Sequence, residues 1–240
     1  MFRQKLSFSI FANIKVDDLK RFNRLKKSFY SIKKSNPDKW IINIRGSYKI
    51  KVFLFLNKNL IKKNLIFTEY NSPLGWFYDT KKMLKFFDTK LVFIWNEDYI
   101  LNDNIKNFHN ILKDLHYYKI DQFVYGSLNH DNYKIFKILN ANFTKNIFFK
   151  KFNKNLRVKF NKIIKEKKLI QNKYIVSLPQ IMNFKTFKKV INIDDPPIKR
   201  WSKFTPFDFE KGPYDYHFLP STIAFPTNKK LFKDIDYKRE

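Results

Sequence analysis

The sequence predicts a single α/β domain built on a mostly parallel central sheet flanked by helices. Short apolar runs alternate along the chain with segments of helical periodicity, which is typical of strand–helix–strand units. The run Leu91–Trp95 contains no polar residue, as expected for a strand that is covered on both faces. The chain has 240 residues, of which 44% are hydrophobic and 19% aromatic, and this is enough for one large core.

Four strands with helices between them are predicted in the first half of the chain. The apolar run Leu6–Ile14 is the first strand, and Asp17 or Asp18 caps the helix that follows it. That helix has apolar residues at every third or fourth position, and it ends near the turn sequence Ser35–Asp38. The remaining elements are the strands Trp40–Ile44, Leu65–Glu69 and Leu91–Trp95, and the helices Val52–Leu60 and Phe77–Phe87.

The second half of the chain has a less regular pattern. No internal repeat and no linker are visible, so we expect one domain over residues 1–240. The segment after Asp194 is rich in proline and aromatic residues, and we assign no element to it. The expected elements are a helix over Asn104–Tyr117, a strand over Gln122–Ser127, a hairpin within Asn146–Val158, a strand over Tyr174–Leu178 and a helix over Thr186–Ile191.

The composition excludes several classes of protein. The chain has no cysteine, which excludes disulfide scaffolds, thiolate zinc sites, iron–sulfur clusters and cysteine nucleophiles. It has no GxxxxGK[ST], GxGxxG or GxSxG motif, so P-loop, Rossmann and hydrolase interpretations lose their usual support. The apolar runs are far shorter than the roughly 20 residues that a membrane-spanning helix needs. No export signal is visible either, and we expect a cytoplasmic protein.

The chain is strongly basic, with 49 Lys and Arg against 21 Asp and Glu, a net charge of +28 and a pI near 10.0. One explanation is genome composition, because Lys, Asn, Ile, Phe and Tyr have A/T-rich codons and the lysines are spread along the whole chain. The other is a surface selected for polyanions, such as an anionic membrane at whose inner face the protein would be peripheral. Either origin gives an affinity for phosphates that falls with salt, and we expect no specific nucleic acid partner.

Two adjacent carboxylates follow the most apolar predicted strand. Glu97 and Asp98 come directly after Leu91–Trp95, and open α/β sheets bind their ligands at the carboxyl ends of such strands. Carboxylate oxygens are the ligands that Mg²⁺ and Mn²⁺ prefer, and these cations commonly share them with substrate phosphates. The alternative is that both acids only cap the next helix. Arg45 and Lys49, which follow the second strand, are candidate contacts for a diphosphate.

The order of these segments resembles nucleotide-sugar-dependent glycosyltransferases of the GT-A type, particularly family-2-like bacterial members. The matching pieces are LSFSIFANI, LKRFNRLKKSFYSI, WIINIRG, the helix start Gly75–Asp79, and LVFIW followed by Asn96-Glu97-Asp98. The last tripeptide stands where these enzymes have a short acidic motif, the DxD, but its first position is Asn96 here. The last acidic position is the usual metal ligand in the family, so the resemblance implies that Asp98 binds Mg²⁺ or Mn²⁺.

The resemblance also implies a donor site and a catalytic base. In GT-A enzymes the base lies well after the DxD, which indicates Asp208 or Glu210 within Trp201–Pro220, and a late histidine can complete the metal shell, which indicates His217. The alternative is that these acids pair with the neighbouring lysines. The residues expected to bind the nucleotide sugar are Asn13, Arg45, Gly75, Trp76, Asp79 and Glu97.

The expected function is the metal-assisted transfer of a sugar from a nucleotide diphosphate donor to the hydroxyl of a glycan or other acceptor, in surface-glycan synthesis. Residues 1–103 would bind the donor, and residues 104–240 would bind the acceptor and supply the base. Two alternatives stay open: a basic RNA-binding or ribosome-associated protein, and an inactive protein with a GT-A-like fold. A transferase should gather Glu97, Asp98 and Asp208 in one cleft, whereas an RNA-binding protein should have a continuous basic face.

Overall fold

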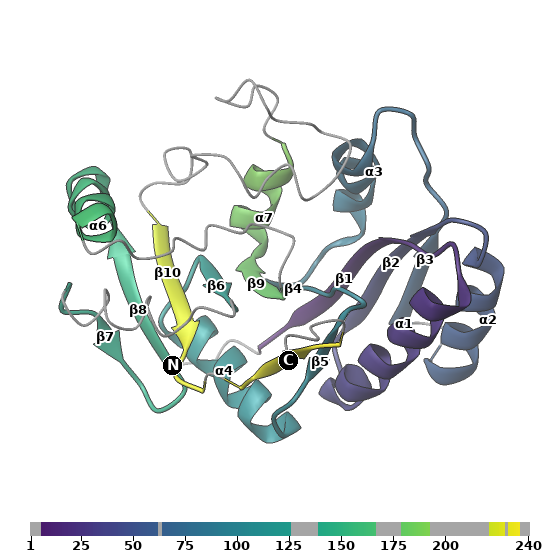
Figure 1. The fold of residues 1–240 in the computed structure, drawn as a ribbon, viewed down its shortest axis with the longest axis horizontal. Helices are drawn as coiled ribbons and strands as arrows, with labels where there is room; N and C mark the ends of the chain where they lie inside the picture. Colours follow the sequence, from purple (N-terminus) through teal and green to yellow (C-terminus); the bar gives the residue numbers. More distant parts are fainter. Residues whose placement is uncertain are drawn as a thin grey trace.

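The computed structural model describes residues 6–61, 64–125, 139–166, 179–192, 221–228 and 230–235 (Figure 1). Nine of the strands in these ranges form one sheet, and two more form a small antiparallel pair. The large sheet contains β1 (Phe8–Lys15), β2 (Lys39–Arg45), β3 (Leu65–Thr68), β4 (Leu91–Ile94), β6 (Gln122–Val124), β7 (Asn142–Phe143), β8 (Ile147–Phe152), β9 (Gln180–Asn183) and β10 (Ser221–Pro226). The pair consists of β5 (Tyr99–Leu101) and β11 (Phe232–Asp234).

The sheet has the strand order β3-β2-β1-β4-β9-β6-β10-β8-β7. Strands β3, β2, β1 and β4 are parallel to one another, β9 runs antiparallel to both β4 and β6, and β10 is parallel to β6 and antiparallel to β8. The chain moves outward from β1 to β2 and β3, and then returns to place β4 on the other side of β1. In open α/β sheets, ligands bind at the carboxyl ends of the strands where the order reverses in this way.

Helices cover both faces of the sheet because its central strands are apolar on both. In β1, Ile10, Ala12 and Ile14 face one core and Phe11 faces the other, which is the period of two expected of a strand. The first core is completed by α1 (Leu19–Ile32), α2 (Lys49–Asn59) and α4 (Ile105–Tyr117), and the second by α3 (Trp76–Met83) and α7 (Phe184–Ile191). A third cluster joins β8 and β10 to α6 (Lys154–Glu166).

Local sequence explains where α1 begins and ends. Asp18 is its N-cap, with extended backbone, and its carboxylate accepts a hydrogen bond from the Arg21 amide at 2.7 Å. Leu25, Phe29 and Ile32 are buried in the first core, while the short 3₁₀ helix η1 (Lys33–Ser35) continues the chain. Asn36 then takes a left-handed conformation, which ends the helical segment. The helix therefore starts at the carboxyl end of β1, beside the point where the strand order reverses.

The structure confirms the α/β fold with a mostly parallel sheet and most elements of the first half, where β1, β2, β3, β4, α1 and α4 lie within about two residues of their predicted bounds. Helix α2 begins three residues before the predicted Val52, and the predicted helix Phe77–Phe87 is α3 followed by the 3₁₀ helix η3 (Leu84–Phe86). No helix of the described ranges is long and apolar enough to cross a membrane.

The expectations for the second half are partly wrong. The predicted hairpin Asn146–Val158 ends at Phe152, where β8 gives way to α6, because Leu156, Phe160 and Ile163 recur at helical spacing and pack on the third cluster. Strands β9 and β10 were not predicted, and the expected strand Tyr174–Leu178 lies outside the described residues.

Candidate functional site at the carboxyl ends of β1, β2 and β4

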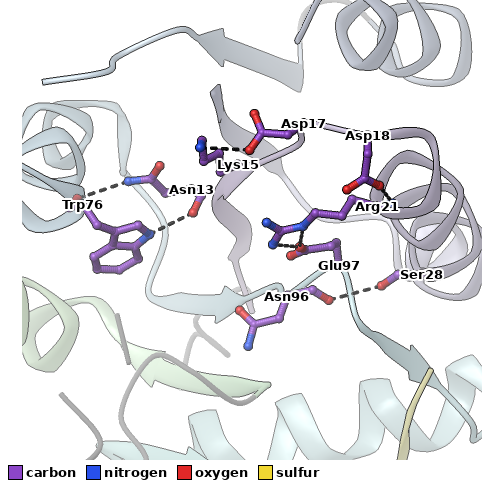
Figure 2. A network of polar contacts seen from close by, with 9 residues as sticks. All are labelled: Asn13, Lys15, Asp17, Asp18, Arg21, Ser28, Trp76, Asn96 and Glu97. Carbon is purple, nitrogen blue, oxygen red and sulfur yellow. Dashed lines mark hydrogen bonds and ion pairs between the residues drawn. The ribbon is translucent and has the colours of Figure 1, made fainter. Parts of the chain in front are cut away.

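Polar and charged side chains gather where β1, β2 and β4 end. Figure 2 shows the two sides of this region, with Asn13 and Trp76 on one side of β1 and with Arg21 and Glu97 on the other. Asn13 and Lys15 end β1, Arg45 ends β2, and Glu97 follows β4. Together with the start of α1, these residues form the candidate site.

Asn13 and Asn43 lie side by side in β1 and β2 and form the buried floor of the site on the α3 side. The Asn43 amide donates to Asn13 Oδ1 at 2.9 Å and to the Tyr70 carbonyl at 2.9 Å. Asn43 Oδ1 accepts from Thr68 Oγ1 at 2.8 Å and from the Tyr70 amide at 2.7 Å. These bonds join β1, β2 and the end of β3, and they satisfy an amide that has no exposed surface.

The start of α3 is fixed to the same floor. Asn13 Nδ2 donates to the Trp76 carbonyl at 3.2 Å and to Thr80 Oγ1 at 3.0 Å, and the Trp76 indole donates back to the Asn13 carbonyl at 2.8 Å. Trp76 is 3% exposed, and its ring packs edge-on against Phe11. The predicted donor-site residues Asn13 and Trp76 thus lie together, and they position the site from inside the core.

Asp79 and Gly75 shape the loop before α3. Asp79 is fully buried, and both of its carboxylate oxygens accept from the Ser72 amide, at 3.1 and 3.2 Å. Gly75 is the N-cap of α3 with φ of 90°, a conformation that favours glycine. The buried carboxylate therefore holds the loop that leads from β3 to α3.

The loops after β1 and β2 are tied together. The Val16 amide donates to the Arg45 carbonyl at 2.8 Å, the Tyr48 amide donates to the Val16 carbonyl at 3.0 Å, and Ser47 Oγ donates to the Asp17 carbonyl at 2.7 Å. Gly46 has φ of 96°, and a Cβ at this position would lie 2.5 Å from the Val16 carbonyl oxygen. Only glycine permits this close approach of the two backbones.

Arg21 and Glu97 form an ion pair between α1 and the loop after β4. Arg21 Nε and Nη2 both donate to Glu97 Oε1, at 3.1 and 2.5 Å, and the Glu97 side chain is only 10% exposed (Figure 2). The pair fixes a guanidinium at the carboxyl edge of the sheet. Arg21 is not among the site residues predicted from the sequence, although its place in the first turn of the helix after β1 is a signal that it borders the site.

The loop after β4 is also held from α1 through Ser28. The indole of Trp95 donates to Ser28 Oγ at 2.7 Å, and Ser28 Oγ donates to the carbonyl of Tyr99 and, at 3.4 Å, to that of Asn96. Ser31 Oγ, one turn later, accepts from the Leu101 amide at 3.0 Å. The segment that carries the acidic motif is therefore anchored to α1 along its length.

The cationic side chains of Lys15, Arg21 and Arg45 border the site, and their surroundings differ. Lys15 Nζ lies 2.9 Å from the Asp17 carboxylate, and its hydrogen bond lowers the pKa of Asp17. Burial lowers the pKa of the Arg45 guanidinium, and the charge of Arg21 lowers it further, while Asp79 and Asp17 act in the opposite direction. Arg45 Nε is buried and has no hydrogen-bond partner among the described residues. The Arg45 guanidinium therefore keeps a donor that no described residue uses.

The described residues do not fit a divalent cation by themselves. The charge of Glu97 is neutralised by Arg21. The first position of the DxD motif, which is acidic in GT-A enzymes, is the uncharged Asn96 here. In the described ranges no three His, Cys, Asp or Glu side chains converge into a group that can hold a metal. Asp98, which follows Glu97, is half-buried, and its backbone carbonyl accepts a hydrogen bond from the Ile235 amide at 2.7 Å.

The predicted site residues divide into two sets. Asn13, Arg45, Gly75, Trp76, Asp79, Glu97 and Asp98 lie at the carboxyl edge around β1, β2 and β4. The predicted base, Asp208 or Glu210, and the predicted ligand His217 lie outside the described residues.

The fold is similar to that of a solved protein, although the sequence matches no family model and no curated protein. A fragment of S. aureus TarS, 1–349, aligns with a TM-score of 0.55 and 13% identity, and covers 95% of this chain. A longer S. aureus TarS structure aligns over 50% of this chain and 21% of its own, with a TM-score of 0.38 and 12% identity. The chain spans 60% of the length of the 1–349 fragment. The likeness to that fragment shows the fold, which is α/β and GT-A-like.

Proposed function

We propose that this protein transfers a sugar from a nucleotide diphosphate donor to an acceptor hydroxyl. The observation that carries the proposal is a pair of guanidinium groups where the strand order reverses between β1 and β4: Arg21, which Glu97 holds, and Arg45, whose Nε no described residue accepts from. The fold adds support, because TarS, whose fragment is similar to 95% of this chain, is a glycosyltransferase of the GT-A type.

The cations match the charge that develops in such a reaction. When the acceptor oxygen attacks the anomeric carbon, the bond from that carbon to the diphosphate breaks and negative charge collects on the leaving group. Guanidinium groups held in place stabilise that charge without reorganising. Arg21 is held by Glu97, and the half-buried Arg45 has an Nε that no described residue accepts from. We therefore assign the diphosphate to Arg45, with Arg21 beside it.

The polar floor has a positioning role in this proposal. Asn43 and Trp76 both hydrogen-bond to Asn13, and these bonds hold the ends of β1 and β2 in a fixed relation. A donor site benefits from such rigidity, because its groups then need no ordering when the substrate binds.

Two parts of the proposal depend on residues outside the described ranges. For an inverting transfer, Asp208 or Glu210 takes the proton of the acceptor hydroxyl, and its loss should lower kcat by about 10²–10⁴-fold with donor affinity retained. A divalent cation, Mg²⁺ or Mn²⁺, would need more ligands than Asp98.

The experiment is a thermal-shift panel of nucleotide sugars with and without Mn²⁺, followed by a transfer assay with any donor that stabilises the protein. We expect at least one donor to raise the Tm, and Arg45→Gln to weaken its binding about tenfold or more, because a charge-assisted bond to phosphate is lost. Lys113→Gln is the matched control, since Lys113 is an exposed cation of α4. A panel without any stabilising donor, or equal effects of the two variants, would contradict the proposal.

A further inference from the structure

Helix α2 exposes an apolar stripe on the face that points away from the sheet. Val52 and Leu56 are buried in the first core, whereas Ile50, Phe53 and Leu54 are 63%, 38% and 60% exposed. Successive residues of a helix are about 100° apart, so these three side chains lie on one side of α2. We call Ile50, Phe53 and Leu54 the α2 face.

The α2 face lies at one end of the molecule and continues onto neighbouring elements. Figure 1 shows α2 at the right-hand margin, beside α1 and β3. The ring of Phe53 lies 5.0 Å from that of Phe67 in β3, the last strand of the sheet, whose residues are all half-buried. On another side of α2, about 140° from Ile50, Phe55 contacts the exposed Tyr30 of α1, with ring centroids 5.6 Å apart. An exposed apolar area of this kind indicates an interaction surface.

The charged residues of α1 and α2 are all cationic. Helix α1 has five Lys or Arg and α2 has three, and neither helix contains Asp or Glu. At 100° per residue, Lys51 and Lys58 flank the stripe on the side of Leu54, and Lys49 flanks it on the side of Phe53. Lys49 is paired with Glu69 at 2.6 Å. The occupant of this surface must accept aliphatic side chains and carry negative charge beside them.

Exposed aliphatic side chains beside lysines favour one kind of binding partner over the others. A second copy of the chain would bring the lysines of two α2 helices into one interface, and like charges there are costly. RNA would neutralise the lysines but stacks on aromatic rings, and it gives no favourable environment to Ile50 and Leu54. A bilayer with anionic lipids supplies both an apolar interior and phosphates at its surface.

We propose that the protein docks on an anionic lipid bilayer through α2, which lies in the plane of the interface. Ile50, Phe53 and Leu54 enter the boundary between headgroups and acyl chains, and Lys51 and Lys58 contact the lipid phosphates. The inference rests on the α2 face alone and does not depend on sugar transfer. In this orientation the loop after β2, which carries Gly46, lies next to the bilayer because it leads directly into α2.

The test has to separate insertion of the stripe from general attraction of a protein with a charge of +28. The full chain is sedimented with vesicles of phosphatidylcholine alone and of phosphatidylcholine with phosphatidylglycerol, at about 0.15 M salt. The double variant Ile50→Ser with Leu54→Ser keeps the net charge, so attraction by charge alone predicts no change. We expect binding to the anionic vesicles to weaken by about tenfold or more, because two buried aliphatic side chains are lost. Tyr117→Ser is the control, since Tyr117 of α4 is 77% exposed.

A second measurement tests which helix enters the lipid. Leu54→Trp should be quenched by brominated lipids beyond the level of the unmodified chain, whereas Tyr117→Trp should not be. Lys51→Glu with Lys58→Glu should weaken binding to anionic vesicles about tenfold or more, at about 1 kcal/mol for each lost cation. Absence of binding to anionic vesicles, or equal binding by the double serine variant, would overturn the proposal. A dimer that this variant converts to a monomer would assign the α2 face to a second copy instead.

Discussion

Arg21 and Glu97, which are 76 positions apart in the sequence, meet through two hydrogen bonds to one carboxylate oxygen, at 3.1 and 2.5 Å. The contact joins the first turn of α1 to the loop after β4, on either side of the point where the strand order reverses. A carboxylate that the sequence presents as part of an acidic motif therefore holds a cation of the same chain. In the proposed function, the guanidinium groups at this edge contact the diphosphate.

Removal of the Glu97 charge should destabilise the fold. Glu97→Gln leaves Arg21 with a neutral partner in a partly buried place, and we expect the free energy of unfolding to fall by about 1–3 kcal/mol, between the values for exposed and buried pairs. Denaturation in urea measures this change. Glu69→Gln is the control, because the pair of Glu69 with Lys49 is exposed and should contribute less than about 1 kcal/mol. If both substitutions lower the free energy of unfolding equally, the Arg21–Glu97 pair stabilises the fold no more than an exposed ion pair does.

The buried side-chain amide of Asn43 should contribute strongly to the stability of the fold. Asn43→Leu keeps the volume but leaves the Asn13 Oδ1, the Thr68 hydroxyl and the Tyr70 amide without their partner, so we expect a loss of about 3 kcal/mol or more. Thr68→Val removes a single bond of the network and should cost about 1 kcal/mol. Urea denaturation measures the free energy of unfolding of both variants. The prediction is refuted if Asn43→Leu is as stable as Thr68→Val.

Much of the first half of the fold follows from local pattern. The apolar run that forms β1, the cap at Asp18 and the fully apolar Leu91–Trp95 each specify their element without help from distant residues. Strands β9 and β10 could not be predicted in the same way. Their residues include Gln180 and Ser221, whose partners Gln122 and Phe152 come from distant parts of the chain. A short strand that depends on such pairing has little signal of its own.

The location of the candidate site in the fold could be predicted from the sequence, but only some of its residues could. The carboxyl ends of β1, β2 and β4 meet because the strands are parallel, and the resemblance to glycosyltransferases pointed to residues there. Arg21 was missed, since one of five cations in a helix looks like an ordinary surface residue. Its role depends on Glu97, and a pairing over 76 positions has no local pattern.

Asp103 should make stability depend on pH. Burial raises the pKa of its carboxyl group, but hydrogen bonds from the Asn228 and Asn107 side chains and from the Asn104 amide outweigh it, and the pKa is lowered. A lowered pKa stabilises the fold above the unfolded value of about 3.9, and the contribution is lost as pH falls further. Asp103→Asn should therefore be less stable than the original chain at pH 7, and the difference in Tm should narrow below about pH 4. A constant difference from pH 7 to pH 3 would contradict the assignment.

Gly46 should be the least replaceable residue of the loop after β2. In Gly46→Ala the new methyl group must be held at φ of 96° and lie 2.5 Å from the Val16 carbonyl oxygen, which is backbone and cannot turn away. Left-handed strain alone costs about 1–3 kcal/mol, and the contact adds to it, so we expect a loss of about 2–4 kcal/mol. Ser47→Ala is the matched control in the same loop, because it removes only the exposed bond to the Asp17 carbonyl and should cost about 0.5–1 kcal/mol. Urea denaturation compares the two, and donor binding adds a second readout, since separation of the loops after β1 and β2 moves Arg45. If Gly46→Ala is no less stable than Ser47→Ala, the two backbones do not need their close approach.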